Sequence, residues 1–282
     1  MENAKNIDQL VKDRWDANSE EWARQIRTGE DVYRERFLEP AFMDFVGKLD
    51  GLEVLDGGCG EGTSSRVLAR SNARVSAVDL SPEMIANALS FESAEPLGIE
   101  YHRASVEKTP FPDERFDIVT SWMALSDMSC YAAAMKEFAR VLKPGGKLVF
   151  CIRHPCYFTS QMAVVRKSKA EAPFLLVGDY FRQTPWMEKW SFAGGNQEAV
   201  GQSSFSNIRF PYTLSDCING VLEAGLSLTE LREPRPSEYL CKELPRLWFW
   251  NKQAALYLFV SAVKGTASPF DRLTAEFVAQ HS

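Results

Sequence analysis

Glycines and carboxylates gather at one point of the chain, where a short apolar run ends. The run EVLD at 53–56 leads directly into Gly57-Gly58-Cys59-Gly60-Glu61-Gly62. Glycines let the backbone turn sharply and let a ligand approach the main chain where a Cβ atom would collide. Asp56 places a carboxylate at the entrance of this loop, and Asp79 ends the next apolar run. The pattern predicts a loop that binds a ligand beside carboxylates.

The spacing of these glycines argues against a dinucleotide ligand. A dinucleotide fingerprint reads GxGxxG. Counted from Gly58 it requires glycine at position 63, which is Thr63, and counted from Gly60 it requires glycine at position 65, which is Ser65. A carboxylate at Asp56 would also repel a pyrophosphate and attract a positively charged ligand. An NAD-dependent oxidoreductase is therefore the least favoured class of enzyme.

Strands and helices are expected to alternate around this loop. Alternation of short apolar runs with helical patterns predicts βαβ units, hence an α/β fold with a parallel sheet between two helical layers. After an interruption, the alternation resumes with a helix at 213–225 and strands near 226–232 and 254–263. The earlier strands are expected at 53–56, 75–78, 99–102, 116–121 and 147–152, and the helices at 62–70, 82–92 and 130–142.

Four motifs, in this order, resemble class I S-adenosylmethionine-dependent methyltransferases of the type 11 group. They are VLDGGCGEG, AVDLSPEM, RFDIVTSWMALSDM and RVLKPGGKLVF. The likeness is strong over residues 50–152 and looser over FPYTLSDCINGVLEAGLSLTELREP. It implies a Rossmann-like, doubly wound fold with a seven-stranded, mostly parallel sheet, and S-adenosylmethionine as the cofactor.

The residues expected to hold the cofactor follow the first four strands. Asp79 can accept hydrogen bonds from both ribose hydroxyls, and Ser81-Pro82 suits the start of the next helix better than Asp79 does. Asp56 is expected to contact the cofactor directly or through a water, or else to brace the loop. The predicted set is Asp56, Gly58, Cys59, Gly60, Asp79, Leu80, Met84, Ser105, Val106 and Trp122.

Ser105 departs from the family pattern. Many relatives have an acidic residue after the third strand that takes the adenine amino group, and this place falls on Ser105. Its hydroxyl and the backbone of Val106 can serve instead, whereas Glu107, the nearest carboxylate, equally suits a solvated loop. Leu80 and Met84 are expected to pack against the adenine or within the core.

Methyl transfer depends on alignment of the nucleophile, and an oxygen or nitrogen nucleophile often also needs its proton removed. His154 follows the fifth strand and is the candidate base because its pKa lies nearest working pH; alternatively it bonds the main chain where the strand ends. Asp127 is expected to orient His154 or to cap the 130–142 helix. Cys156 is expected only to pack.

The stretch at 121–127, SWMALSD, faces the methyl group in related enzymes. It does not read as Asn/Asp-Pro-Pro-Tyr, which, together with the acidic charge of the chain, argues against methylation of nucleobase or glutamine amino groups.

Aromatic residues before and after the alternating region predict a covered, water-poor site. The segment 154–212 breaks the βα rhythm yet holds eleven aromatics, which predicts an ordered insertion rather than a linker. Such a cover favours a small or medium apolar substrate, or a peptide end. The side chains expected to face it are Trp15, Trp22, Tyr33, Arg34, Met123, Tyr157 and Trp186.

These expectations divide the chain into four parts. They are an N-terminal helical lid at 1–50, a cofactor-binding body at 51–153 and 213–265, an inserted substrate cap at 154–212 and a C-terminal tail at 266–282.

Composition limits the partners of the chain. Its 282 residues are 45% apolar and 25% charged, and the net charge of −6 argues against nucleic acid. The first residues lack the apolar core of a signal peptide, so we expect a cytoplasmic protein without a membrane segment. Six scattered cysteines and three histidines predict no metal site.

Three functions fit these features. The favoured one is methylation of an oxygen or nitrogen of a small molecule. A peptide or protein carboxylate is the second candidate substrate, and a catalytically silent cofactor-binding module is the third reading.

Overall fold

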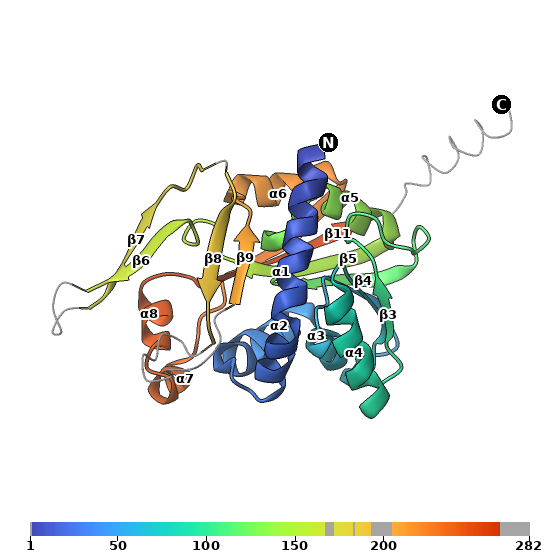
Figure 1. The fold of residues 1–282 in the computed structure, drawn as a ribbon, viewed down its shortest axis with the longest axis horizontal. Helices are drawn as coiled ribbons and strands as arrows, with labels where there is room; N and C mark the ends of the chain where they lie inside the picture. The colour runs from blue at the N-terminus through green and yellow to red at the C-terminus, as the bar shows by residue number, and fades with distance from the viewer. Residues whose placement is uncertain (1, 167–171, 183, 193–204, 266–282) are drawn as a thin grey trace, which may run out of the picture.

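A seven-stranded sheet forms the centre of the molecule (Figure 1). The structure, a computed structural model, describes residues 2–166, 172–182, 184–192 and 205–265. The strands follow the order β10-β11-β5-β4-β1-β2-β3, and β11 alone runs antiparallel to its neighbours in this sheet. This confirms the predicted Rossmann-like, mostly parallel fold. The strands are β1 (Glu53–Gly57), β2 (Arg74–Asp79), β3 (Glu100–Arg103), β4 (Phe116–Trp122), β5 (Leu142–Arg153), β10 (Leu226–Arg232) and β11 (Tyr257–Lys264).

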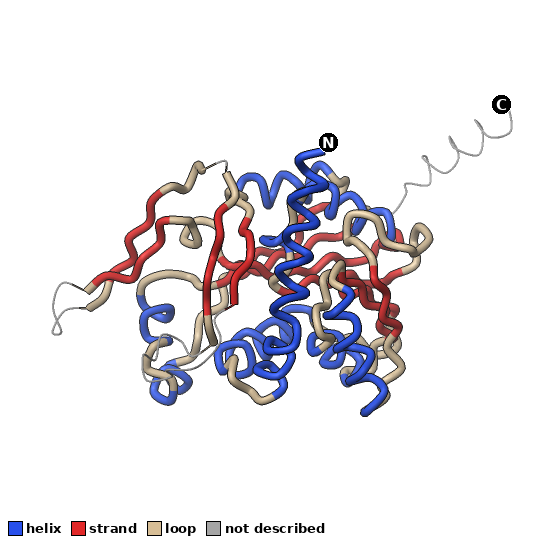
Figure 2. The backbone as a smooth tube through the Cα atoms, viewed as in Figure 1, coloured by secondary structure: helices blue, strands red, loops and turns tan. Residues whose placement is uncertain are grey.

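Helices cover both faces of this sheet (Figure 2). Successive side chains of a strand point to opposite faces, so Val54 joins one buried cluster while Leu55 joins the other. One cluster includes residues of α5 and α6, and the other residues of α2, α3 and α4. The helices are α1 (Glu2–Arg27), α2 (Glu39–Val46), α3 (Thr63–Arg70), α4 (Pro82–Ala94), α5 (Tyr131–Val141), α6 (Leu214–Glu223), α7 (Glu238–Glu243) and α8 (Leu247–Lys252).

The described residues of the segment 154–212 form two antiparallel pairs of strands. They are β6 (Gln161–Val165) with β7 (Phe174–Gly178), and β8 (Trp186–Trp190) with β9 (Phe205–Arg209). The β8–β9 pair lies beside α1, whereas β6–β7 projects from the body (Figure 1). Val11 of α1 packs against Ile208 and Phe210, and Asn18 donates a hydrogen bond to the carbonyl of Ser206 at 3.0 Å. The N-terminal helix and β8–β9 therefore form one layer.

Local features of the fold differ from the expectations. Strand β5 begins at Leu142, five residues early, because the Pro144-Gly145-Gly146 turn continues the pairing with β4 through a register shift near Phe116. The short helices α7 and α8 lie in a region where the sequence predicted neither helix nor strand. Residues 266–282, expected to form a tail, lie outside the described residues. In the described part of the chain, no helix combines the length and apolarity needed to cross a bilayer.

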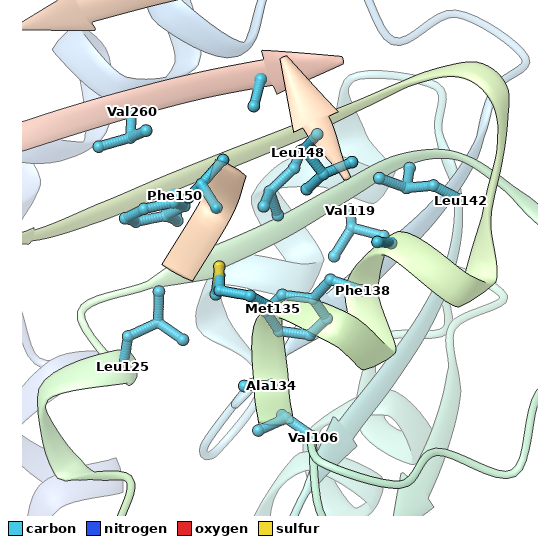
Figure 3. Packing of buried hydrophobic residues seen from close by; sticks show 14 of the residues in the cluster. Val106, Val119, Leu125, Ala134, Met135, Phe138, Leu142, Leu148, Phe150 and Val260 are labelled. Atoms are coloured by element: carbon cyan, nitrogen blue, oxygen red, sulfur yellow. The ribbon is translucent and has the colours of Figure 1, made fainter. Parts of the chain in front are cut away.

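Phe138 of α5 joins the core to the glycine loop, which is residues 57–62. Its ring is fully buried in the cluster that includes Val119 of β4, and Figure 3 shows it beside Met135. A Cβ atom added at Gly57 would lie 2.8 Å from this ring, so the ring and the loop backbone are in close contact.

Truncation at Phe138 should therefore destabilise the fold strongly. We expect Phe138→Ala to lower the free energy of unfolding by about 3–5 kcal/mol, measured by urea denaturation, because it leaves a cavity in the core. Leu222→Ala on α6, where the leucine is 48% exposed, is the matched control and should stay within about 0.5 kcal/mol of the wild type. A loss below about 1 kcal/mol in Phe138→Ala would contradict this packing.

Candidate active site

A cavity of about 760 Å³ lies at the carboxyl ends of β1, β2 and β4. Its wall includes Gly58 after β1, Asp79 at the end of β2 and Trp122 at the end of β4. Side chains of α1 and β8 close it from the other side, among them Trp15 and Trp190. In open α/β sheets, ligands bind in this position.

The glycine loop needs its missing side chains for two different reasons. Gly58 has φ 77°, and an added Cβ would lie 2.5 Å from the Cβ of Ala124, so this position is closed by the β4 loop, which is residues 123–128. Gly60 has φ 56°, and an added Cβ would have no atom within 4 Å. Since Gly60 lines the cavity, its open side is available to a ligand.

Asp79 ties this loop to the next helix. Its Oδ2 accepts a hydrogen bond from the Gly60 amide at 2.9 Å, and its Oδ1 accepts one from the Ser81 amide at 2.9 Å. Ser81 caps α4 by accepting from the Met84 amide, as predicted. Burial raises the pKa of the Asp79 carboxyl. A carboxylate has acceptor capacity for further donors beyond these two, so a ligand hydroxyl can still bind.

Asp56 does not line the cavity and instead braces the loop from within. It is fully buried and accepts hydrogen bonds from Ser65 at 2.7 Å and Thr120 at 3.3 Å. Burial raises the pKa of its carboxyl to about 6. The predicted direct contact with the cofactor is therefore wrong, because no side of Asp56 forms part of the wall. The bracing alternative agrees with these contacts.

The other residues expected to bind the cofactor all line the cavity. Ser105 also accepts a hydrogen bond from the amide of Glu107 at 3.2 Å, so its hydroxyl shapes the turn after β3. Trp122 packs edge to face on Phe42 at 4.5 Å, and its buried indole nitrogen has no partner among the described residues. The lining members of the predicted set are Gly58, Cys59, Gly60, Asp79, Leu80, Met84, Ser105, Val106 and Trp122.

A cluster of polar side chains lies where the segment before α2 meets α3. Arg34 donates to the hydroxyl of Ser64 at 3.1 Å, and its amide donates to Asp31 at 3.1 Å. Glu61 accepts from Thr63 at 2.8 Å, and burial raises the pKa of its carboxyl. Arg34 and its neighbour Tyr33 were predicted to line the site, and both do. Asp31, Glu61 and Ser64 also line it and were missed.

Four aromatic side chains cover the cavity, and we call them the aromatic roof: Trp15, Trp22, Trp190 and Phe192. Trp15 and Trp22 meet edge to face at 5.1 Å, and Trp190 lies 6.0 Å from Trp15 and 6.3 Å from Trp22. Phe192 lies 4.8 Å from Trp22. The sequence predicted Trp15 and Trp22, but it missed the two members from the β8 region.

Two residues expected to face the substrate lie elsewhere. Trp186 lines a separate cavity of about 40 Å³, and Tyr157 packs on His154 with ring centres 4.6 Å apart. Met123, the remaining residue that was expected to face the substrate, does line the main cavity. Which face of a strand pair lines a cavity depends on how the pair packs against the rest of the molecule. The residue types alone do not reveal this packing.

His154 is also absent from the wall of the main cavity. It is 4% exposed, its Nε2 lies 2.7 Å from Glu233, and its Nδ1 accepts a hydrogen bond from the Cys156 amide at 3.3 Å. Desolvation lowers the pKa of this imidazole. The prediction that His154 faces the transfer site is therefore wrong, because both ring nitrogens are engaged where the strand ends. Asp127 is not its hydrogen-bond partner, since Glu233 holds that position, and Asp127 does not cap α5 either, because the N-cap residue of that helix is Cys130.

Asp127 belongs instead to a buried network of charges. It forms an ion pair with Arg209, whose Nε also donates to Glu188 at 2.5 Å. Glu188 accepts from both terminal nitrogens of Arg153 at 2.7 Å. The Arg209 guanidinium lies 4.6 Å from the ring centre of Trp190, and burial lowers its pKa to about 9. Asp127, Arg209 and Arg153 line the cavity.

The wall of the cavity suits a sulfonium cofactor. Among the described residues, six acidic side chains line it against four basic ones. The glycine loop is open at Gly60, and Asp79 retains acceptor capacity for hydroxyls. These features fit S-adenosylmethionine. No group of side chains with metal-ligand character occurs in the part of the chain that the structure describes.

Comparison with known proteins agrees with this site. Residues 55–150 match the methyltransferase domain family. A demethylmenaquinone methyltransferase of Tropheryma whipplei is 38% identical over 116 residues, which are 41% of this chain and 48% of that protein. A ubiquinone biosynthesis O-methyltransferase of Xanthomonas oryzae is 38% identical over 115 residues, which are 39% and 48% of the two chains. The chain thus spans about half the length of the curated relatives it matches.

A solved structure extends the similarity to most of the fold. The S-adenosylmethionine-dependent methyltransferase of Mesorhizobium loti has a TM-score of 0.65 at 24% identity, over 80% of this chain and 96% of that one. The fold is therefore that of class I S-adenosylmethionine-dependent methyltransferases, and residues 55–150 are similar to a methyltransferase domain. The resemblance indicated by the sequence motifs is confirmed.

Gly60 offers a direct test of the cofactor pocket. We expect Gly60→Ala to weaken binding of S-adenosylhomocysteine at least tenfold in calorimetry, because the new methyl group projects into the cavity. Gly98→Ala is the matched control, since Gly98 also has positive φ, open space around an added Cβ and an amide bonded to a carboxylate. Equal binding by the two variants would contradict the assignment.

Asp56 predicts a specific pH dependence of stability. Its folded pKa of about 6 lies above its ordinary value, so the neutral carboxyl favours the folded state at low pH and this contribution is lost as the pH rises through 6. We therefore compare the free energies of unfolding of Asp56→Asn and the wild type at several pH values. From pH 4 to pH 7 the difference should change by about 2–3 kcal/mol in favour of the variant. Parallel stability curves for the two proteins would show that Asp56 titrates normally.

Proposed function

We propose that this protein is a methyltransferase that uses S-adenosylmethionine to methylate an oxygen or nitrogen of a small or medium-sized molecule. The observation that carries the proposal is one cavity with two different walls. The glycine loop and Asp79 line one part, and the aromatic roof lines another. A cofactor and an apolar acceptor can therefore meet in the same cavity.

The residues around the glycine loop would hold the cofactor. Asp79 would accept the ribose hydroxyls, and Leu80, Met84 and Val106 offer apolar surface to the adenine ring. When bound, S-adenosylmethionine supplies a methyl group on a positively charged sulfur. The acidic character of the wall favours that charge. The protein's own task is to align the acceptor and to exclude water.

The size of the cavity supports a small acceptor. Its volume of about 760 Å³ lies within the range of small-molecule pockets, and the cofactor and the acceptor share it. Helix α1 and strand β8 cover it, which leaves little room for a polymer. The chain matches about half the length of proteins named demethylmenaquinone methyltransferase and ubiquinone biosynthesis O-methyltransferase. These names support an acceptor of this size.

The parts of the chain have separate roles in this proposal. Residues 51–153 and 213–265 form the body that binds the cofactor, and residues 1–50 form a lid. Within the proposed cap at 154–212, β8 and β9 supply the side chains that face the acceptor, since Trp190 and Arg209 line the cavity. The β6–β7 pair contributes none of the lining residues.

Turnover and cofactor binding test the proposal together. We expect the protein to form S-adenosylhomocysteine, measured by mass spectrometry, with at least one member of a panel of hydroxylated and amino aromatic compounds. Asp79→Asn should weaken cofactor binding by about 1.5–3 kcal/mol, because it removes a charged hydrogen-bond acceptor. Asp113→Asn is the control, since Asp113 is exposed and pairs with Arg140 at the surface.

Two outcomes would contradict the proposal. The first is a protein that binds NAD but neither S-adenosylmethionine nor its demethylated product. The second is a cofactor affinity that is identical in Asp79→Asn and Asp113→Asn.

A further inference from the structure

The β8–β9 pair brings a charged network to the cavity that the proposed function has not used. Resting on that function, we propose that Asp127 accepts the proton of the substrate's nucleophile, that Arg209 positions Asp127, and that the acceptor is a hydroxyl on an aromatic or enolic ring.

The packing of the backbone holds Asp127 close to the glycine loop. It ends a 3₁₀ turn, Leu125–Asp127, that follows β4. Ala124, the residue just before this turn, touches Gly58, and only the missing Cβ of Gly58 allows this approach. Asp127 is 7% exposed and lines the cavity. A carboxylate thus stands at the end of the strand next to the glycine loop.

Other carboxylates of the wall are differently placed. Asp79 is bonded to amides of the glycine loop and α4, and Asp31 is bonded to the amide of Arg34. Asp8 accepts from the hydroxyl of Ser129, and Glu61 accepts from Thr63. Asp127 differs from these because its partner, Arg209, also stacks on a member of the aromatic roof.

Three contacts fix the side chain of Arg209, and one of them is with this carboxylate. Its guanidinium pairs with Asp127, donates to Glu188 and lies over the ring of Trp190. The end of β9 also binds the β4 loop directly, because the Phe210 amide donates to the Ser126 carbonyl at 3.1 Å. A planar guanidinium with several fixed partners orients a carboxylate better than a flexible ammonium would.

The charge balance of the network favours a neutral substrate. Glu188 and Asp127 carry two negative charges, and Arg209 and Arg153 carry two positive ones. No positive charge in this network is left over for an anionic substrate, so a carboxylate acceptor gains nothing here. A neutral acceptor that donates a hydrogen bond to Asp127 suits the network better.

The chemistry limits the acceptor further. A carboxylate is a weak base, so it assists an acidic hydroxyl far better than an aliphatic alcohol. Phenols, whose pKa is about 10, and enols carry hydroxyls that are more acidic than those of aliphatic alcohols. The aromatic roof would pack against a flat ring edge to face or in offset stacks. These two requirements together select a hydroxyl attached to a planar unsaturated ring.

The proton and electron balance of the step is complete. The O–H bond of the acceptor breaks, and its proton passes to a carboxylate oxygen of Asp127. The freed electron pair forms the new O–CH₃ bond, while the pair of the broken S–CH₃ bond stays on sulfur. The products are the methyl ether and S-adenosylhomocysteine, and Asp127 releases its proton to solvent.

The test uses 4-nitrocatechol, whose absorbance reports whether its hydroxyl is ionised, bound to the complex with S-adenosylhomocysteine. In the wild type, the negative charge of Asp127 should keep the hydroxyl protonated and raise its pKa. We expect the bound pKa to be at least one unit lower in Asp127→Asn. Asp113→Asn, the surface control, should match the wild type.

Arg209→Lys tests the positioning role because it keeps the positive charge but loses the planar fork. We expect the pKa difference caused by Asp127→Asn to shrink at least threefold in the Arg209→Lys background. A difference that stays the same in both backgrounds would limit Arg209 to a structural role and overturn that part of the inference.

The outcomes separate this inference from the proposed function. Failure of S-adenosylhomocysteine to bind would contradict the proposed function. If it binds but 4-nitrocatechol does not, the aromatic hydroxyl class is wrong. If 4-nitrocatechol binds with equal pKa in the wild type and Asp127→Asn, Asp127 does not face the acceptor hydroxyl.

Discussion

The close contact between Gly58 and Ala124 is the constraint on which the site depends. Strands β1 and β4 are neighbours in the sheet, so the loops that follow them leave its edge side by side. The two loops can touch only because position 58 has no side chain and adopts a positive φ. This contact sets the spacing between the part of the cavity around Asp79 and the part around Asp127.

The N-terminal helix and the insertion complete a site that the sheet alone leaves open. Trp15 and Trp22 come from α1, whereas Trp190 and Arg209 come from β8 and β9, and all four line one cavity. The packing of Val11 on Ile208 holds these two elements together. The aromatic roof and the buried charged side chains therefore form one packed unit, in which Arg209 touches both Trp190 and Asp127.

The sequence predicted the sheet and the residues of the glycine loop well because their signals are local. A strand end, a run of glycines and Asp79 lie within one βαβ unit, whose geometry is narrowly limited. Arg209 could not be found this way, since its role comes from docking of an antiparallel pair that shows no periodic pattern. His154 was misplaced for a related reason: leaving a strand at the ligand edge does not fix the direction of a side chain, and Glu233 draws it away from the cavity.

A crystal structure of the complex with S-adenosylhomocysteine would show whether this cavity holds the cofactor beside Asp127. We expect the ribose hydroxyls to bind the carboxylate of Asp79, the chain of the ligand to pass Gly60, and its sulfur to face the space between Asp127 and the aromatic roof. A ligand bound outside this cavity, or one whose sulfur points away from Asp127, would show that the site is assigned wrongly.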